Sequence, residues 1–241
     1  MLHHTRGIVL HHFRYSETSV IARIYTEKFG LQSYLIKGVR SAKAKIKLSM
    51  LGHLSLLEMV VYYRQGKGLQ NIKELKPAHV FRSLHSDIRK SSQALFINEL
   101  VYKSVKEEEH NQVLFRFLFD TVVELDNPAN FSADYHLVFM LNLSRFLGFA
   151  PRQNYTYGSW FNLCEGIFET HRPGHPHIIE PDYTETFNKL LSSPTQNIDP
   201  TPLPASIRKI LLDKMIEFYR LHLPAFSGLQ SPEVLHEVLK A

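Results

Sequence analysis

The first third of the chain alternates short apolar runs with turn residues, a pattern typical of β-strands. The run at residues 54–63 is long and apolar, as a central strand would be, and Gln65-Gly66-Lys67-Gly68 after it predicts a hairpin connection. Five strands are predicted in all, at residues 7–15, 20–26, 31–36, 54–63 and 69–76. Their number and the longer connection between the third and fourth predict an OB-fold barrel, although a generic five-stranded barrel or sandwich would give the same pattern.

From residue 79 onward, apolar residues recur at helical spacing. Helices are predicted from residue 86 into the acidic residues 107–109, and at 112–125, 133–147, 183–191, 205–223 and 233–240. The helix at 133–147 has so few polar positions that we expect it at the buried centre of a bundle. Residues 149–181, rich in proline and glycine, are predicted to be an irregular insert with a short hairpin near 161–169. The sequence therefore predicts an α+β protein of two domains: a five-stranded OB-fold β-barrel at 1–78 and an α-helical domain at 79–241.

Charged side chains are divided unevenly between these two regions. Residues 1–76 contain 13 Lys and Arg and 4 Glu, a formal charge of +9, whereas residues 77–241 contain 15 Lys and Arg and 19 Asp and Glu, a formal charge of −4. The densest group lies in one predicted loop without any acid and consists of Lys37, Arg40, Lys43, Lys45 and Lys47. Because Lys and Arg neutralise phosphates and release counterions, this pattern predicts a polyanionic partner for the first domain. A solvated basic loop without a partner is the alternative.

Aromatic residues are interleaved with these cations. The first domain contains Phe13, Tyr15, Tyr25, Phe29, Tyr34, Tyr62 and Tyr63. Exposed rings can stack on nucleic-acid bases without reading their sequence, but a small barrel also needs rings in its core, so we expect two or three at most to be exposed. No segment is typical of a recognition helix. We therefore expect binding to the nucleic-acid backbone through the five loop cations, with Arg14 and Arg23 as further contacts.

Signatures of catalysis and of metal binding are weak in this sequence. It has no G-x-x-x-x-G-K-[ST], H-E-x-x-H or G-x-S-x-G motif, so no enzymatic activity is expected. Cys164 is the only cysteine, which excludes an intramolecular disulfide and a cysteine-rich zinc site. His171, His175 and His177 could join it as zinc donors, but their spacing matches no established zinc pattern. We therefore expect neither a metal nor another cofactor.

The same composition carries an expectation about location. Residues 1–6 lack the apolar core of a signal peptide, and no run approaches the roughly 18 apolar residues that a membrane-spanning helix needs. A single cysteine also fits a reducing compartment. We expect a cytoplasmic protein without a membrane partner.

Several short motifs, in their order and spacing, resemble those of the RecO family of bacterial recombination mediators. They are Gly7-Ile8-Val9-Leu10, Tyr15-Ser16-Glu17-Thr18-Ser19, Thr26-x-x-x-Gly30, Lys37-Gly38-Val39-Arg40, Leu57-Glu58, the strand at 69–74, and Gly148-Phe149-x-Pro151. The resemblance covers essentially the whole chain and implies an N-terminal OB-fold followed by an α-helical domain. It also implies binding of single- and double-stranded DNA and annealing of complementary strands. With the RecR partner, such proteins load recombinase onto strands coated by the single-stranded-DNA-binding protein.

The resemblance further implies that the helical domain takes the acidic, hydrophobic C-terminal tail of the coating protein. A pocket for this tail needs apolar walls and a cation for the terminal carboxylate, and the candidates are Arg145, Arg208 and Lys209. Many family members carry a four-cysteine zinc module about where residues 161–177 fall, and this chain keeps only Cys164 there. We expect apolar packing to replace the metal, by Phe161, Leu163, Ile167 and Phe168.

Two alternatives to this function stay open at the level of sequence. The first is a protein-interaction scaffold whose basic barrel docks an acidic partner and never touches DNA. The second is an RNA-binding OB module, which differs from the first hypothesis only in the polymer that it binds.

Overall fold

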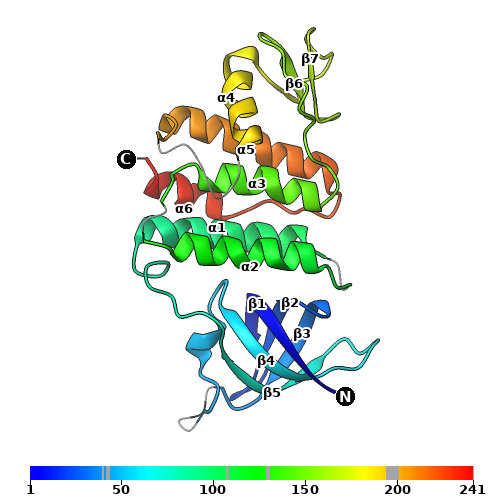
Figure 1. Cartoon of the computed structure of the whole chain (residues 1–241), viewed down its shortest axis with the longest axis vertical. Helices are drawn as coiled ribbons and strands as arrows, with labels where there is room; N and C mark the ends of the chain where they lie inside the picture. Colours follow the sequence, from blue (N-terminus) through cyan, green and yellow to red (C-terminus); the bar gives the residue numbers. More distant parts are fainter. Residues whose placement is uncertain (40, 42–43, 107–108, 129–130, 194–200, 241) are drawn as a thin grey trace. The chain divides into compact units, whose positions relative to one another are not determined.

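The structure is a computed structural model that describes residues 1–39, 41, 44–106, 109–128, 131–193 and 201–240. The chain divides into two compact units, residues 1–87 with 98–128, and residues 88–97 with 129–241, so one boundary falls inside a helix. Figure 1 follows the elements along the chain. None of the helices in the described ranges combines the length and the apolar content that crossing a membrane requires.

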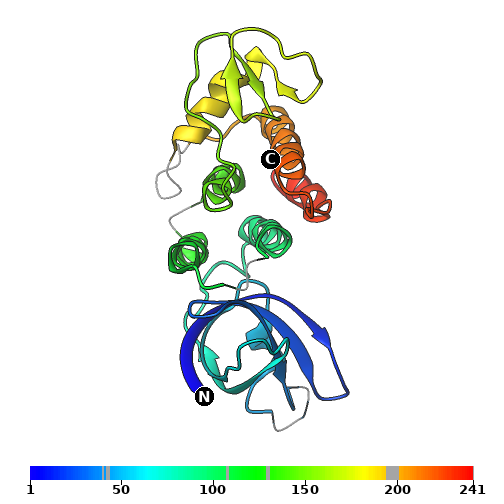
Figure 2. The same ribbon diagram turned by 90° about the vertical axis from the view of Figure 1, so that its right-hand side faces the viewer.

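The first unit contains a closed five-stranded barrel in the order β1-β2-β3-β5-β4, and Figure 2 shows the strands curving around a common interior. Its elements are β1 (Leu2–Arg14), β2 (Val20–Thr26), β3 (Gly30–Ile36), a short 3-10 helix η1 (Leu48–Leu51), β4 (Leu56–Tyr62) and β5 (Gln70–Pro77). Neighbouring strands are antiparallel except β3 and β5, which are parallel. The predicted fold class, a five-stranded barrel followed by helices, is confirmed.

Strand β1 is longer than predicted because its first half pairs with a distant strand. Residues Leu2 to Ile8 pair with β4 in an antiparallel register that runs from Leu2–Tyr62 to Ile8–Leu56. Gly7 lies in β1 opposite Thr26 of β2 and Leu57 of β4, and a Cβ atom there would lie 2.6 Å from Cγ2 of Ile24 and 2.7 Å from Cε of Met59. Only glycine therefore lets β1 pass this close to its neighbours.

Two helices complete the first unit: the second half of α1 (Ile88–Ser104) and the whole of α2 (Gln112–Asp126). They cover the outer face of the barrel by specific contacts. The Tyr25 and Phe115 rings stack with centroids 6.3 Å apart, and Nδ2 of Asn98 donates to the carbonyl oxygen of Leu10 at 2.9 Å. Burial of these apolar faces is the main stabilisation of the unit.

Asp126, the last residue of α2, fixes the segment that leaves the barrel. Its Oδ1 accepts backbone N–H groups from Arg82, Ser83 and Leu84 at 2.9 Å each, and its Oδ2 lies 2.9 Å from Nε2 of His79. Burial alone would raise the pKa of this carboxyl, but the backbone donors and His79 lower the pKa of Asp126 from 3.8 to about 2. The ionised carboxylate therefore holds residues 79–84 against the end of α2.

The second unit combines helices with a small sheet. Its elements are the first half of α1, then α3 (Tyr135–Phe146), β6 (Trp160–Asn162), β7 (Ile167–Glu169), β8 (Ile178–Ile179), α4 (Pro181–Ser192), α5 (Ala205–His222) and α6 (Ser231–Val238). Residues 135–141 of α3 are all buried, and Oη of Tyr219 on α5 donates to the Met140 carbonyl at 2.7 Å. The expectation that this helix is the buried centre of the helical part is confirmed. The predicted hairpin exists as β6 and β7, and β8 adds a third strand.

An aromatic cluster occupies the insert at residues 149–181. The Phe161 ring centroid lies 4.9 Å from Phe168, 4.7 Å from Phe187 and 6.1 Å from Phe218. Phe161, Leu163 and Phe168 are buried, while Ile167 is half-buried. The expected apolar packing at this position is confirmed, with α4 and α5 supplying rings that the sequence did not suggest.

A buried ion pair ties together three segments of the second unit. Nε of Arg208 lies 2.7 Å from Oδ1 of Asp134, and its two other nitrogens donate to the carbonyls of Leu203 and Leu239 at 2.7 Å. Oδ2 of Asp134 accepts the Leu203 N–H at 2.8 Å. Both side chains are almost fully buried, so each charge depends on the other.

Replacing Asp126 with Asn should lower the free energy of unfolding at neutral pH by about 2 kcal/mol, because a pKa lowered by nearly two units is worth roughly that much. A carboxyl whose pKa falls on folding stabilises the protein above its unfolded pKa, so the difference between wild type and D126N should shrink as pH falls from 4 towards about 2. Urea unfolding at several pH values measures both effects. Asp213→Asn, at an exposed position of α5, is the control, and equal losses in the two variants would contradict the assignment.

Arg208→Met should cost about 3–5 kcal/mol of stability, because it leaves the Asp134 carboxylate buried without its partner. Lys209→Met changes the next residue, which is exposed, and should cost no more than about 0.5 kcal/mol. Urea unfolding of the two variants compares a buried cation with a surface cation on the same helix. Similar losses for both would show that the Asp134–Arg208 pair does not stabilise the fold.

Candidate nucleic-acid interface

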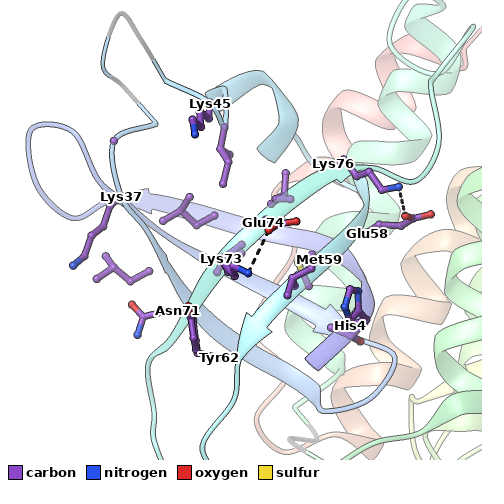
Figure 3. A pocket seen from close by; sticks show the side chains of 18 of the residues that line it. His4, Lys37, Lys45, Glu58, Met59, Tyr62, Asn71, Lys73, Glu74 and Lys76 are labelled. Carbon is purple, nitrogen blue, oxygen red and sulfur yellow. Dashed lines mark ion pairs between the residues drawn. The ribbon is translucent and has the colours of Figure 1, made fainter. Parts of the chain in front are cut away.

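The barrel carries a groove of about 1330 Å³, shown in Figure 3. Residues from β1, β3, β4 and β5 line it, together with residues after β2 and in the loop after β3. Its apolar lining consists of Leu35, Ile36, Ala44, Ile46, Met59, Val60, Ile72 and Leu75. Its charged lining consists of six cations, Arg6, Lys28, Lys37, Lys45, Lys73 and Lys76, and three acids, Glu27, Glu58 and Glu74.

The strand pairing explains why the groove lies here. Strands β3 and β5 pair only at Tyr34–Gln70 and Leu35–Asn71, so the barrel wall is thin on this side. Gln70 is buried and holds the preceding turn, with Nε2 donating to the carbonyls of Arg64 and Lys67 at 2.8 Å each. The end of β3 and the loop after it are therefore free to form one wall of the groove.

Three of the six groove cations are paired with carboxylates of the protein itself. Nη2 of Arg6 lies 2.8 Å from Oε1 of Glu27, and its guanidinium also lies 4.8 Å from the centroid of the Phe119 ring. Hydrogen bonding to Arg6 is the main reason that the pKa of Glu27 is lowered. Figure 3 marks the other two pairs, Lys76 with Glu58 at 2.8 Å and Lys73 with Glu74 at 3.6 Å. These three cations are partly neutralised before any ligand arrives.

The other three cations, Lys28, Lys37 and Lys45, form no ion pair within the ranges that the structure describes. Lys37 and Lys45 flank the loop after β3, and both are exposed. Gly38 has a φ of +72°, which side chains with a Cβ rarely adopt, and its carbonyl accepts the Ser41 hydroxyl at 2.8 Å. This turn follows β3, and Ala44, Lys45 and Ile46 of the same loop line the groove. Two of these three cations therefore lie in the loop that the sequence singles out, and the third, Lys28, lies between β2 and β3.

The predicted loop cations reach different places. Lys37 and Lys45 line the groove, whereas Lys47 is exposed just before η1 and is not part of the lining. Arg40 and Lys43 lie outside the described residues. Two of the five, Lys37 and Lys45, therefore lie in one groove, and DNA binding by any of the five stays a prediction.

Arg14 and Arg23 do not join the groove. Nε of Arg14, at the end of β1, donates to the Ser16 carbonyl at 3.3 Å. Nη1 of Arg23, in the middle of β2, donates to the Ser33 hydroxyl at 3.1 Å. Neither residue is part of the groove lining, because the alternation of strand β2 and the end of β1 place them on another face.

The expectation that few aromatic rings are exposed is confirmed. Of the seven in the first domain, Tyr62, Phe13 and Tyr15 have relative exposures of 46%, 46% and 59%. Tyr25 and Tyr34 are buried, and the rings of Phe29 and Tyr63 stack with centroids 3.9 Å apart. Tyr62 lines the groove, so a base could stack there beside the cations.

Sequence reasoning missed two further cations beside the groove. A smaller pocket of about 300 Å³ is lined by Arg64 and Lys67 and shares Tyr62 and Asn71 with the groove. The track of exposed cations therefore continues from Lys37, past Tyr62, to the hairpin at 64–68. The signal was present as cations flanking a glycine-rich turn, but only the pairing of Tyr62 with Asn71 places them beside the groove.

The three cations proposed to bind a partner's tail differ in their exposure to solvent. Lys209 is exposed on α5, and Arg145 is exposed on α3 with Nη2 donating to the Leu191 carbonyl at 3.1 Å. Arg208 is buried against Asp134, so its guanidinium is not available to a ligand, contrary to the expectation from sequence. The sequence did not indicate this burial because the partner, Asp134, lies 74 residues away in the chain.

The donor set in the insert does not fit a zinc site. Cys164, His171, His175 and His177 all lie in described ranges, yet no three metal-binding side chains converge among the described residues. Nδ1 of His177 instead lies 2.6 Å from Oε1 of Glu217. Burial also raises the pKa of the Cys164 thiol, which disfavours the thiolate that binds zinc.

Comparisons with known proteins identify the family. The family model described as "Recombination protein O N terminal" matches residues 1–81, and that described as "Recombination protein O C terminal" matches residues 85–228. The chain is 37% identical over 240 residues to a protein named DNA repair protein RecO from Bacteroides fragilis, covering 99% of each chain. It is 36% identical over 239 residues to the protein of the same name from Phocaeicola vulgatus, again with 99% of each covered. That from Flavobacterium psychrophilum is 34% identical over 236 residues, with 97% of this chain and 98% of the relative covered. With both family models matched and such relatives aligned along its whole length, the chain belongs to the RecO family of DNA repair proteins.

Proposed function

We propose that this RecO-family protein is a non-enzymatic cytoplasmic mediator that binds single- and double-stranded DNA in the barrel groove and anneals complementary strands. We propose further that it acts with RecR to load recombinase onto strands coated by the single-stranded-DNA-binding protein. The observation that carries the DNA-binding part is that one groove contains an exposed ring and several cations with no ion pair among the described residues. Lys28, Lys37 and Lys45 lie in the groove with Tyr62, and the track continues to Arg64 and Lys67.

The charge balance of the groove suits a polymer of phosphates. Six cations against three acids leave it positive, and the three cations with no ion pair among the described residues are exposed, so phosphates can reach them. Each phosphate that a Lys or Arg neutralises releases a counterion, which favours binding whatever the base sequence. Tyr62 adds stacking, worth roughly 1–3 kcal/mol per base on a single strand.

Annealing follows from the same electrostatics. Two complementary strands repel each other as they approach, and this repulsion opposes pairing. A cationic surface that binds both strands lowers the repulsion while they search for register. Base pairing and stacking then supply the free energy, and no bond is made or broken.

The double variant Lys37→Ala/Lys45→Ala should weaken binding to a labelled oligo-dT strand and reduce the slope of log K against log salt by about 1.4, because each phosphate contact on a single strand contributes about 0.7. Fluorescence anisotropy between about 50 and 200 mM salt measures both quantities. The effect should be similar for an unrelated base sequence, since none of these side chains is placed to read base edges.

The matched control is Lys73→Ala/Lys76→Ala, which removes two cations from the same groove that are already paired with Glu74 and Glu58. This control should change the slope much less than the Lys37/Lys45 variant. If the wild type and the Lys37/Lys45 variant gave equal slopes of log K against log salt, the proposal that DNA binds in the groove would be wrong. Tighter binding of RNA or of an acidic peptide than of DNA would favour the alternatives of an RNA-binding module or a protein scaffold.

For the coating protein's acidic tail, we propose Lys209 and Arg145 as the receiving cations, since Arg208 is buried. The charge-reversing variants Lys209→Glu and Arg145→Glu should each weaken binding of a fluorescent acidic peptide with a free C-terminal carboxylate by about fivefold or more, because truncating a charged contact costs more than 1 kcal/mol. Lys189→Glu, on α4, is the control for a general change in charge. If both variants bound the peptide as tightly as the wild type, the proposal that Lys209 and Arg145 bind the tail would be wrong.

A further inference from the structure

A second surface of cations and rings lies in the first unit, apart from the groove. It is formed by His11, Phe13, Arg23, Tyr102 and Lys106, and we call it the β1–α1 surface. None of the five lines the groove or the smaller pocket beside it. Phe13 and Lys106 are exposed, and the other three are half-exposed.

The rings of this surface form a continuous row. The His11 ring centroid lies 6.3 Å from that of Phe13 and 5.2 Å from that of Tyr102. The ammonium of Lys106 lies 5.5 Å from the centroid of the Tyr102 ring. Burial is the main cause that lowers the pKa of His11, which favours the neutral form of its ring. The row is therefore an aromatic strip with a cation at one end.

Arg23 lies beside this row. It is the direct cross-strand partner of His11, and paired residues of an antiparallel ladder point to the same face. Its Nη1 donates to Ser33, and its Nε, which is buried, has no hydrogen-bond partner among the described residues. A buried N–H group without a partner costs free energy, so the guanidinium is not fully hydrogen-bonded within the described residues.

Among the described residues, two cations of this surface have no carboxylate partner. Nζ of Lys103 lies 2.8 Å from Oε1 of Glu99, whereas Arg23 and Lys106 form no ion pair within the described ranges. Burial and the positive charges of Arg23 and Lys103 lower the pKa of Lys106, which shows that these cations lie close enough to repel each other. An anion bound between Arg23 and Lys106 would relieve that repulsion.

Exposed rings continue past the end of β1. Phe13 and Tyr15 have relative exposures of 46% and 59%, and exposed Arg14 lies between them in the sequence. Rings beside unpaired cations are the combination that binds single-stranded nucleic acid: the cations take phosphates and the rings take bases. A purely acidic protein partner would account for the cations but not for the exposed aromatic strip.

We propose that the β1–α1 surface binds a second single strand of nucleic acid, with a phosphate between Arg23 and Lys106 and bases stacked on Phe13 and Tyr15. This inference rests on the proposed function, because it supplies the second strand that annealing needs. His11 follows Arg6 of the groove by five residues on β1, a distance of about 16 Å along an extended strand. Since the two surfaces share no residue, one barrel can hold two strands at once.

The test uses full-length Arg23→Ala/Lys106→Ala, with Lys106→Glu as a second variant at an exposed position that leaves the barrel untouched. Stopped-flow annealing of two complementary labelled oligonucleotides should slow by about tenfold in both variants, from the loss of two phosphate contacts or one reversed charge. Saturation with short oligo-dT should fall from two strands per protein to one. Affinity for the first strand should stay within about twofold of wild type, because the groove cations are unchanged.

Lys103→Ala is the matched control, since it removes a cation one turn away that Glu99 already neutralises, and it should anneal at the wild-type rate. Wild-type annealing and two-strand saturation in both test variants would overturn the inference. The groove variant Lys37→Ala/Lys45→Ala separates the two proposals. If that variant loses binding while the Arg23/Lys106 variants change nothing, the proposed function stands and the second-strand surface does not.

Discussion

The short contact between β3 and β5 is the constraint on which the candidate site depends. The two strands pair at only two positions, so the barrel is closed by little more than the neighbourhood of Tyr34 and Gln70. A longer parallel ladder would carry the end of β3 along β5 and cover the apolar residues there. With the ladder this short, the chain after Ile36 can turn at Gly38 and bring Lys45 back to the groove. The position of the basic loop is therefore set by the point at which β3 and β5 stop pairing, whereas the sequence of the loop determines its charge.

The same barrel uses its cations in two ways. Arg6 is part of the structure: it pairs with Glu27 and lies over aromatic rings of α2, so it connects strand and helix. Lys37 and Lys45 have no such partner among the described residues and keep their full charge for a ligand. Counting basic residues in the sequence cannot separate these two groups, because the difference lies in carboxylates brought near by strand pairing. The set of cations available to a ligand therefore differs from the set that the sequence indicates. It lacks those paired with Glu27, Glu58 and Glu74, and it gains Arg64 and Lys67.

What could be predicted from the sequence depends on how local the determining interactions are. Strands β2 to β5 and the buried character of α3 follow from hydrophobic periodicity, which is a local signal. The first five residues of β1 have little apolar pattern of their own and become a strand because β4 pairs with them. Arg208 and Lys209 are neighbours of the same charge, yet Arg208 is buried in an ion pair with Asp134 and Lys209 is exposed to solvent. Arg64 and Lys67 were likewise missed as site residues, because only the pairing of β4 with β5 brings the turn that carries them next to the groove.

Partial neutralisation of the groove has a consequence for the proposed mediator role. If all six groove cations contacted phosphates, the salt slope would be steeper by about two than with only the three unpaired ones, and a strand would be held too firmly to release. Stacking in a DNA duplex contributes roughly 1.4 kcal/mol per base-pair step, so a few steps of pairing can outweigh the loss of a few phosphate contacts. A groove that is half neutralised by Glu27, Glu58 and Glu74 therefore suits a protein that must bind a strand and then let it go into a duplex. In this view the acids of the groove are as much a part of the site as its lysines, because they set how easily pairing displaces the protein.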